Sequence, residues 1–486
     1  MLVNEKLIMK KQYQFLLYFL LSIVFNVSGQ NIAVQKQIED YILEVQQQYE
    51  VPGISLCVIK GDEVFYKKNF GFANIEHSVP IKKTSIFRVY SLTKPIIAVT
   101  VFQLIEQGKL SLEDAISKYI KGLPDSWKDI QVKHLLTHSS GLPDMRVFGS
   151  GAELTEQSAK EKAFKESMRF SKGERYDYNQ TNFWLLHRII EKITGEKLAD
   201  FIAKNQFEGE RTNVFFSSDS KQIVKNRVTS YFPFATGTMI IDLPTIEGDY
   251  MFAANGLNIT LDELVKWDKR LKENKLLKPE TKMKMWETFS YTASDKVFGY
   301  SWNKITRNRH DSYGFTGSLI TAYRIFPKDK LSIFLLSNGL GKIYDIDTVV
   351  DKIANIIDKD IYNVQEQTFY KLYQILEDKG LADFKKSYKT LNELPNYNEL
   401  NLEEMVNSLG YTFLRNQELQ KAIQLFTFNT QQYPNSANVY DSLGEAYLIQ
   451  NELKLAEKNY QKAIALGGTN GNAKEMLVRI QAKKKK

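Results

Sequence analysis

The chain has 486 residues, of which 43% are hydrophobic and 25% are charged, the composition of a soluble globular protein. This length exceeds what a single hydrophobic core usually organises, so we expect two or more domains. The formal net charge of +8 comes mostly from the two ends, because three lysines stand against one glutamate in residues 1–29 and residues 483–486 are all lysine. The remainder is nearly balanced and has no basic helix interleaved with aromatic residues, which excludes a nucleic-acid-binding class.

Residues 1–29 are interpreted as a signal peptide. A pair of lysines precedes an apolar run over residues 15–25, and two small residues close the run. That run is too short to span a membrane. The single cysteine, Cys57, stands well beyond the cleavage site, so neither a disulfide nor an N-terminal lipid anchor is expected. The sequence therefore predicts a secreted or periplasmic protein without a stable membrane anchor.

The next segments predict a helix followed by a hairpin. Residues 32–49 have the apolar spacing of an amphipathic helix. Residues 54–59 and 63–66 are strand-like and are separated by a Lys-Gly-Asp turn. An extended stretch over residues 85–90 then leads to Ser91, which begins an apolar helix that we expect to be buried.

Ser91 and Lys94 are three residues apart at the start of this helix. Side chains at positions i and i+3 face each other across one helical turn, so the amine of Lys94 can lie beside the hydroxyl of Ser91. A serine hydroxyl is a weak nucleophile, and a neighbouring lysine can accept its proton. Taken alone, this spacing more often marks a serine that caps the helix and a solvated lysine. The motifs that flank the pair favour the nucleophile.

Six short motifs follow one another in the stretch from about residue 30 to residue 360. They are Val51-Pro52-Gly53, Phe87-Arg88, Ser91-Leu92-Thr93-Lys94, residues 134–142, residues 173–182, and Gly314-Phe315-Thr316-Gly317-Ser318. In this order and spacing they resemble the serine beta-lactamase and penicillin-binding-protein-like hydrolases, especially the branch with class C beta-lactamases, D-alanyl-D-alanine carboxypeptidases and related esterases. The resemblance implies an α/β (α+β) fold: an antiparallel sheet flanked by helices, an all-helical subdomain, and a site between them.

The resemblance also assigns roles to residues of this chain. Ser91 would be the nucleophile, and Lys94 and Tyr178 would share the proton transfers. The backbone amides of Ser91 and Ser318 would form the oxyanion hole. For Tyr178 the alternative is a core tyrosine that precedes the helix over residues 181–193. No cofactor is implied, and the sequence has no metal-binding cluster.

The substrate-binding residues implied by the resemblance are Gln180, Phe315, Thr316 and Gly317. Two of them depart from the family pattern. Phe315 stands where a lysine or histidine is usual, and Gln180 stands where an asparagine is usual. Glutamine keeps the donors and acceptor of an amide on a longer stem, so contact with Lys94 remains available. The departures argue against penicillin-like substrates more than against acyl transfer.

His134 and His138 match a structural stretch of the family and are interpreted as packing residues. Further elements expected from the resemblance are a helix capped by Thr260 and Glu263, strands over residues 298–302, 319–326 and 331–336, and a helix over residues 345–357.

The last part of the chain repeats itself with a period of 34 residues. Leu409-Gly410, Phe413, Ala422 and Phe426 recur as Leu443-Gly444, Tyr447, Ala456 and Tyr460. Small and large residues paired in this way resemble tetratricopeptide repeats. An unrelated helical hairpin is the alternative. The predicted domains are a signal peptide (1–29), the hydrolase domain (30–362), a helical linker (363–400), two repeats (401–471) and a basic tail (472–486).

The sequence therefore predicts an exported serine hydrolase of the beta-lactamase-related carboxypeptidase or esterase type. It would act through an acyl-enzyme on an amide or ester of a small molecule or peptide, and the repeats would bind a protein partner. The alternative is a catalytically weak, beta-lactamase-like binding module joined to a protein-interaction domain. Phe315 and Gln180 are the residues that favour this alternative.

Overall fold

The computed structural model describes residues 31–145, 155–208, 213–219, 222–233, 239–241, 251–341, 346–394, 397–467 and 472–484. It divides into an N-terminal unit that ends at Ile361 and a C-terminal unit that begins at Tyr362 and includes Arg307–Arg309. The signal peptide predicted over residues 1–29 lies outside the described residues. Within those residues, no helix is both long and apolar enough to pass through a lipid bilayer.

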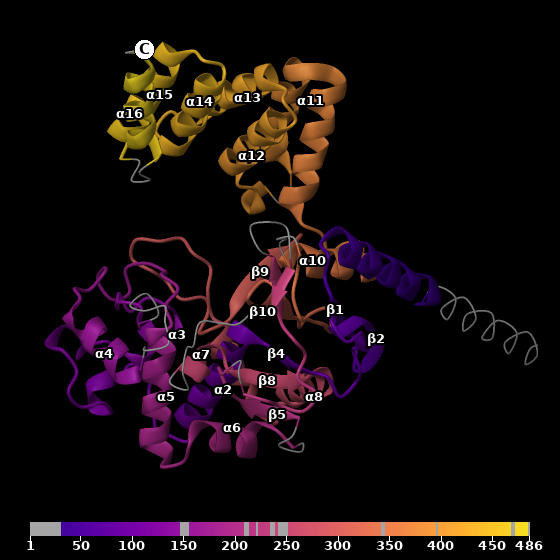
Figure 1. Cartoon of the computed structure of the whole chain (residues 1–486), viewed down its shortest axis with the longest axis vertical. Helices are drawn as coiled ribbons and strands as arrows, with labels where there is room; N and C mark the ends of the chain where they lie inside the picture. The colour runs from indigo at the N-terminus through magenta and orange to yellow at the C-terminus, as the bar shows by residue number, and fades with distance from the viewer. Residues whose placement is uncertain are drawn as a thin grey trace, which may run out of the picture. The chain divides into compact units, whose positions relative to one another are not determined.

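The N-terminal unit is built on a large antiparallel sheet. In the described residues this sheet has seven strands in the order β3-β2-β1-β12-β11-β10-β9. Figure 1 labels β1, β2, β9 and β10 of this sheet. Their bounds are β1 Gly53–Lys60, β2 Glu63–Asn74, β3 Val79–Pro80, β9 Asn303–Arg307, β10 His310–Gly317, β11 Thr321–Phe326 and β12 Leu331–Ser337. The pairs β3–β2, β2–β1, β1–β12, β12–β11 and β11–β10 are antiparallel. The predicted antiparallel sheet is confirmed, although the strand expected over residues 298–302 is instead β9.

The sheet is covered on both faces because its central strands are apolar on both faces. Along β1, Leu56 and Val58 join a core with the helix over residues 31–48 and with α10 (Ile346–Ile357). Cys57 and Ile59 join the core on the other face. Successive side chains of a strand point to opposite faces, so one buried strand contributes to two cores.

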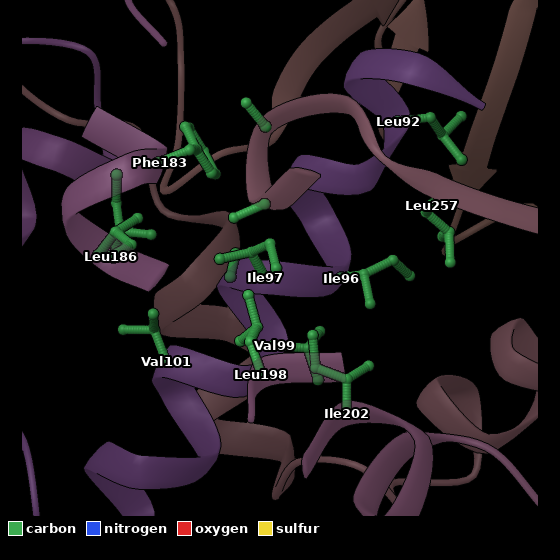
Figure 2. Close-up of a cluster of buried hydrophobic side chains, with 14 of the residues drawn as sticks. Leu92, Ile96, Ile97, Val99, Val101, Phe183, Leu186, Leu198, Ile202 and Leu257 are labelled. Atoms are coloured by element: carbon green, nitrogen blue, oxygen red, sulfur yellow. The ribbon is translucent and has the colours of Figure 1, made fainter. Parts of the chain in front are cut away.

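Helix α2 (Thr93–Glu106) lies at the centre of the second core. Figure 2 shows its residues Ile96, Ile97, Val99 and Val101 against residues of α5 (Thr181–Thr194) and α6 (Leu198–Gln206). A helix that is apolar all round is buried on all sides. The start of α2, which carries Lys94, is therefore held in a rigid and largely dry environment.

The helical part and a small second sheet complete the N-terminal unit. The small sheet has the order β4-β8-β5, with bounds β4 Ile86–Arg88, β8 Leu257–Thr260 and β5 Val214–Phe216. The other elements are β6 Tyr231–Pro233, β7 Met239–Ile241, η1 Tyr90–Leu92, η2 Ile116–Lys118, η3 Asp125–Trp127, α3 Val132–Leu136, α4 Glu156–Lys165, α7 Phe252–Asn255, α8 Leu261–Lys272 and α9 Pro279–Trp286. The hydroxyl of Thr260 accepts from the amide of Glu263 and so caps α8.

From Val364 onward, the elements of the C-terminal unit in the described residues are helices (Figure 1). Its elements are α11 Val364–Lys389, η6 Leu391–Glu393, η7 Tyr397–Glu399, α12 Leu402–Arg415, α13 Leu419–Gln432, α14 Ala437–Ile449, α15 Leu453–Ala465 and α16 Asn472–Lys484. Helix α11 lies in the stretch over residues 363–400 that the sequence predicts as a helical linker, and Gly380, with a φ of 81°, divides it into two segments. Glycine adopts this angle without a steric penalty, so the break falls there.

The 34-residue period corresponds to equivalent packing in two successive helix pairs. A Cβ atom on Gly410 of α12 would lie 2.4 Å from the ring of Phe426 in α13, and one on Gly444 of α14 would lie 3.1 Å from the ring of Tyr460 in α15. In each helix pair, the aromatic ring of the second helix thus packs against the backbone of the glycine in the first helix. The assignment of these pairs to the tetratricopeptide class stays a prediction.

Candidate active site

Ser91 lies in a short turn just before α2, and its side chain does not cap that helix. Strand β4 ends at Arg88, and the chain then makes the 3-10 turn η1 before α2 begins. Tyr90 in this turn has a φ of 48°, an uncommon conformation for a residue other than glycine. Neither η1 nor α2 has a side-chain cap. The capping alternative for Ser91 therefore does not hold, and its hydroxyl bonds elsewhere.

The hydroxyl of Ser91 contacts both of the groups that the sequence proposed as its partners. Its Oγ lies 2.6 Å from the phenol oxygen of Tyr178 and accepts from Nζ of Lys94 at 3.3 Å. Lys94 Nζ also donates to Oε1 of Gln180 at 2.9 Å and to the carbonyl of Ala254 at 2.8 Å. Lys94 is fully buried, and these oxygen acceptors compensate for its loss of water. Ser91, Lys94, Tyr178 and Gln180 thus form one connected polar cluster.

Electrostatics in this cluster lowers the pKa of Tyr178. Burial raises the pKa of the Tyr178 phenol, but the charge of Lys94 and hydrogen bonds with Lys94, Ser91 and Gln180 lower it, and the net pKa lies below its ordinary value. The Nζ atom of Lys94 is also 4.8 Å from the centre of the Tyr178 ring. A tyrosine whose pKa is lowered beside a serine hydroxyl can accept the proton of that hydroxyl.

His138 holds the segment that carries Tyr178. Its Nδ1 accepts from the backbone amide of Asn179 at 3.0 Å, and its ring centre is 4.6 Å from that of Tyr178. Burial, and then the charge of Lys94, lower the pKa of His138 well below 6.5, so the ring is neutral at pH 7. The Nδ1 of His134 accepts from the amide of Gln131 and closes the first turn of α3. Both histidines act in packing and local structure.

The end of β10 lies directly beside the turn that carries Ser91. A Cβ atom on Gly317 would be 2.1 Å from the carbonyl oxygen of Val89, so glycine is required at this approach. The next amide along the chain is that of Ser318. The amide of Ser91 belongs to the first turn of η1, where amides have no acceptor within the helix. The two amides that the sequence proposed for the oxyanion hole therefore belong to segments that lie side by side, η1 and the end of β10.

Tyr176, Phe298 and Phe315 form an aromatic wall, and Phe315 is the residue at which the resemblance leads one to expect a lysine or histidine. Phe315 is 4% exposed, and its ring centre is 6.2 Å from that of Phe298. Phe298 in turn is 5.1 Å from Tyr176 and 5.7 Å from His138. Side chains alternate along a strand, so Phe315 shares the face of Gly317, which approaches the Ser91 turn.

Of the residues that the sequence proposed for substrate binding, Gln180 joins the polar cluster and Phe315 joins the aromatic wall. Thr316 lies on the opposite face of β10 from Phe315 because neighbouring residues of a strand alternate. Sequence reasoning missed the carbonyl of Ala254 as an acceptor for Lys94, and it missed Phe298. Backbone acceptors have no sequence signature, so the Ala254 carbonyl could not be found from the sequence. Within the described residues, no group of three or more potential metal ligands was found.

Comparison with known proteins gives one consistent family. The sequence profile of the family described as Beta-lactamase matches residues 38–354. Penicillin-binding protein 4* of Bacillus subtilis (strain 168) is 22% identical over 377 residues, which cover 73% of this chain and 83% of that protein. The structure of the octameric penicillin-binding protein homologue from Pyrococcus abyssi has a TM-score of 0.57 and 25% identity, with 69% of this chain and 81% of that chain covered. The structure of the D-amino acid amidase from Ochrobactrum anthropi SV3 has a TM-score of 0.57 and 20% identity, with 68% of this chain and 99% of that chain covered.

Proposed function

The chain belongs to the beta-lactamase family of serine hydrolases, and from this premise we propose that it is an exported hydrolase that cleaves an amide or ester through an acyl-enzyme on Ser91. One observation carries the proposal: a single hydroxyl, that of Ser91, contacts both Tyr178 at 2.6 Å and Lys94 at 3.3 Å. A nucleophile that touches a group able to take its proton, itself held by a third group, is the arrangement that nucleophilic catalysis needs.

The proposed reaction has two halves that use the same groups. Ser91 Oγ attacks the substrate carbonyl while its proton passes to Tyr178, whose ionised form is stabilised by Lys94. The negative oxygen of the tetrahedral intermediate accepts from the amides of Ser91 and Ser318. The carbon–heteroatom bond then breaks, and the leaving group takes the proton. Water, activated by the same pair, attacks the acyl-enzyme and releases the acid and the free serine.

Gln180 supports the proposal although it departs from the family pattern. Its Oε1 accepts from Lys94 at 2.9 Å, so the longer side chain reaches the lysine that the usual asparagine would be expected to reach. The Ala254 carbonyl provides a further acceptor at 2.8 Å. Together these two oxygens orient the amine of Lys94 toward Ser91 and Tyr178.

The aromatic wall points to neutral substrates. A carboxylate beside Phe315 would lose water without gaining a donor from its ring. We therefore propose that neutral esters and amides are cleaved in preference to substrates with a free carboxylate near that wall, and that beta-lactams are poor substrates. Amino acid amides with an aromatic side chain belong in the test panel, because a solved structure with this fold is an amidase described in complex with L-phenylalanine amide.

Labelling with a fluorophosphonate tests the proposal directly. This reagent phosphonylates an activated serine, and we expect a single modification located at Ser91 by peptide mass spectrometry. Ser91→Ala should abolish labelling, whereas Ser55→Ala, which removes a buried hydroxyl bonded to Asn69, should not. Absence of labelling in the folded wild-type protein would favour the alternative of a catalytically weak binding module.

We also propose that residues 1–29 direct export and that the two C-terminal helix pairs bind a protein partner. The apolar run over residues 15–25 and the 34-residue period support these proposals. Expression of the full chain in a bacterium with a periplasm, followed by N-terminal sequencing of the protein recovered from each compartment, tests export. A protein retained whole in the cytoplasm would contradict it.

A further inference from the structure

Thr321 is a buried residue to which the reaction outlined above gives no role. It is the first residue of β11, it is fully buried, and its Oγ1 lies 3.0 Å from the carbonyl oxygen of Val89 and 3.3 Å from that of Gly317. These two carbonyls belong to segments far apart in the sequence. The hydroxyl has one proton, which it donates to the nearer Val89 oxygen and shares with the Gly317 oxygen, so it links the turn before Ser91 to the end of β10.

The Val89 carbonyl is part of the turn that sets the position of Ser91. It also accepts from the amide of Leu92 at 3.1 Å, and this bond closes the turn around Ser91. A hydrogen bond from Thr321 to the same oxygen fixes this turn to strand β11.

The Gly317 carbonyl is part of the peptide unit that carries the amide of Ser318. Because a peptide unit is planar and trans, the direction of its N–H is set by the direction of its C=O. The amide of Ile320 donates to the Gly317 carbonyl at 3.0 Å and holds this plane inside the hairpin. Thr321 follows Ile320 in the sequence, and its hydroxyl connects this hairpin to the carbonyl of Val89.

Thr321 is itself held rigidly. Its backbone pairs with Gly317 of β10 on one side and with Leu336 of β12 on the other. A hydroxyl on an interior strand has little freedom to move, so it can set a distance between two neighbouring segments. A Cβ atom on Gly317 would lie 2.5 Å from Oγ1 of Thr321 and 2.1 Å from the Val89 oxygen, which shows how close the three groups are.

We propose that Thr321 is a positioning residue that sets the separation of the two oxyanion-hole amides, those of Ser91 and Ser318. This inference rests on the proposed function. Amides stabilise a developing oxyanion only when both lie at hydrogen-bond distance from the position that the oxygen will take. A loosened hole weakens binding of the transition state more than binding of the substrate, so the effect falls on kcat and leaves KM nearly unchanged.

The test compares Thr321→Val, which keeps the shape and loses the hydroxyl, with Thr321→Ser, which keeps the hydroxyl. We expect Thr321→Val to lower kcat for an ester by about tenfold to hundredfold, below the 10²–10³ loss caused by removal of an oxyanion donor. KM should change less than about twofold, and an acylaminomethylboronic acid, whose tetrahedral adduct on Ser91 places an oxygen in the hole, should bind more weakly by the same factor as kcat. Thr321→Ser should keep both values.

The matched control is Ser337→Ala. The Ser337 hydroxyl is also buried and bonds to the carbonyl of Ile320 at 2.7 Å, in the same hairpin, but it touches neither Val89 nor Gly317. The Ser337→Ala variant should be less stable than the wild type but should keep its kcat and its affinity for the boronic acid. If Thr321→Val does not fold, Thr321→Cys, with its weak donor, replaces it in the comparison with Thr321→Ser.

Wild-type kcat and boronate affinity in Thr321→Val, or an equal loss in Ser337→Ala, would overturn the positioning role while the hydrolase assignment stands. A wild-type protein that neither turns over esters nor reacts with fluorophosphonate would overturn the proposed function, and the role of Thr321 with it.

Discussion

Glycine allows a close approach in both units of the chain, but the atoms that approach are different. In the N-terminal unit, Gly317 brings the end of β10 against the backbone carbonyl of Val89. In the C-terminal unit, Gly410 and Gly444 admit aromatic rings of the neighbouring helices. A backbone carbonyl cannot move without moving its strand or turn, whereas a ring can shift. The first contact therefore fixes a chemical geometry, and the second fixes only a packing distance.

The two units also differ in what they bury. At the candidate site the N-terminal unit buries Lys94 among the oxygens of Ser91, Gln180 and Ala254. The repeated positions of the C-terminal unit are leucine, small or aromatic residues, and no buried charge stands among them. A buried charge needs several partners at once, so its environment is specified by segments far apart in sequence. We expect substitutions within the polar cluster of Ser91, Lys94 and Tyr178 to change rates, and substitutions at the repeated positions to change stability.

The largest expected effect is that of Ser91→Ala. Loss of the nucleophile should lower kcat by about 10⁴-fold or more, as for other serine hydrolases whose nucleophile is removed. The midpoint of thermal unfolding should stay close to the wild-type value because a single, half-buried oxygen is lost. Steady-state hydrolysis of a chromogenic ester, with calorimetry, makes the measurement. Turnover at the wild-type rate would disprove the assignment of Ser91.

The second effect is non-additivity between Lys94 and Tyr178. Each of Lys94→Ala and Tyr178→Phe should lower kcat by about 10²- to 10⁴-fold, the range of general acid–base catalysis. If the two act on one proton, the double variant should be little worse than the worse single variant. A thermodynamic cycle on kcat/KM measures the coupling. Additive losses in activation free energy would show that they act separately.

The pH dependence of kcat/KM should reveal the ionisation of Tyr178. Its pKa lies below the ordinary value of about 10, and the deprotonated phenol is the form that accepts the proton. Activity should therefore be full above that pKa and fall about tenfold per pH unit below it. Tyr178→Phe should remove this limb from the profile. A limb that persists in that variant would belong to another group.

Phe315→Lys should change substrate preference by about tenfold. A lysine there offers a charged donor to a carboxylate, and a factor of ten corresponds to about 1.4 kcal/mol, just below the range of about 1.5 to 3 kcal/mol for such hydrogen bonds. The measurement is the ratio of kcat/KM for a neutral ester and an otherwise identical anionic ester, in both proteins. Phe315→Leu is the apolar control. A wild-type ratio that favours the anion would show that another residue supplies the positive charge.

Gly410→Ala and Gly444→Ala should both leave hydrolysis unchanged. They should differ in how much they lower the free energy of unfolding. At Gly410 the ring of Phe426 is 2.4 Å from the Cβ position, so we expect a loss of about 1 to 3 kcal/mol from overpacking. At Gly444 the nearest ring atom is 3.1 Å away, and the higher helix propensity of alanine, about 1 kcal/mol, should offset the strain. Chemical denaturation followed by circular dichroism compares them. Equal losses would mean that the two pairs pack alike.

Local patterns predicted a large part of both the fold and the site. The hairpin of β1 and β2, the helix over residues 31–48 and the cap at Thr260 follow from apolar spacing and from turn and cap chemistry, which act between residues near in sequence. The strand expected over residues 298–302 was placed too early, because a buried aromatic run in a loop has the same composition as a strand. Phe298 instead packs with Tyr176 and Phe315.

By itself, the sequence determined which residue types could do chemistry and in what order they come: Ser91 with Lys94 one turn later, Tyr178 after a turn, and glycine before Ser318. Only the tertiary structure decided which oxygens surround Lys94, that His138 holds the Tyr178 segment, and that Thr321 joins β11 to the turn before Ser91. The physical reason is the separation in sequence over which each interaction acts. Helix spacing, caps and turns are set by covalent neighbours, whereas backbone carbonyls and ring faces acquire partners only when distant segments pack.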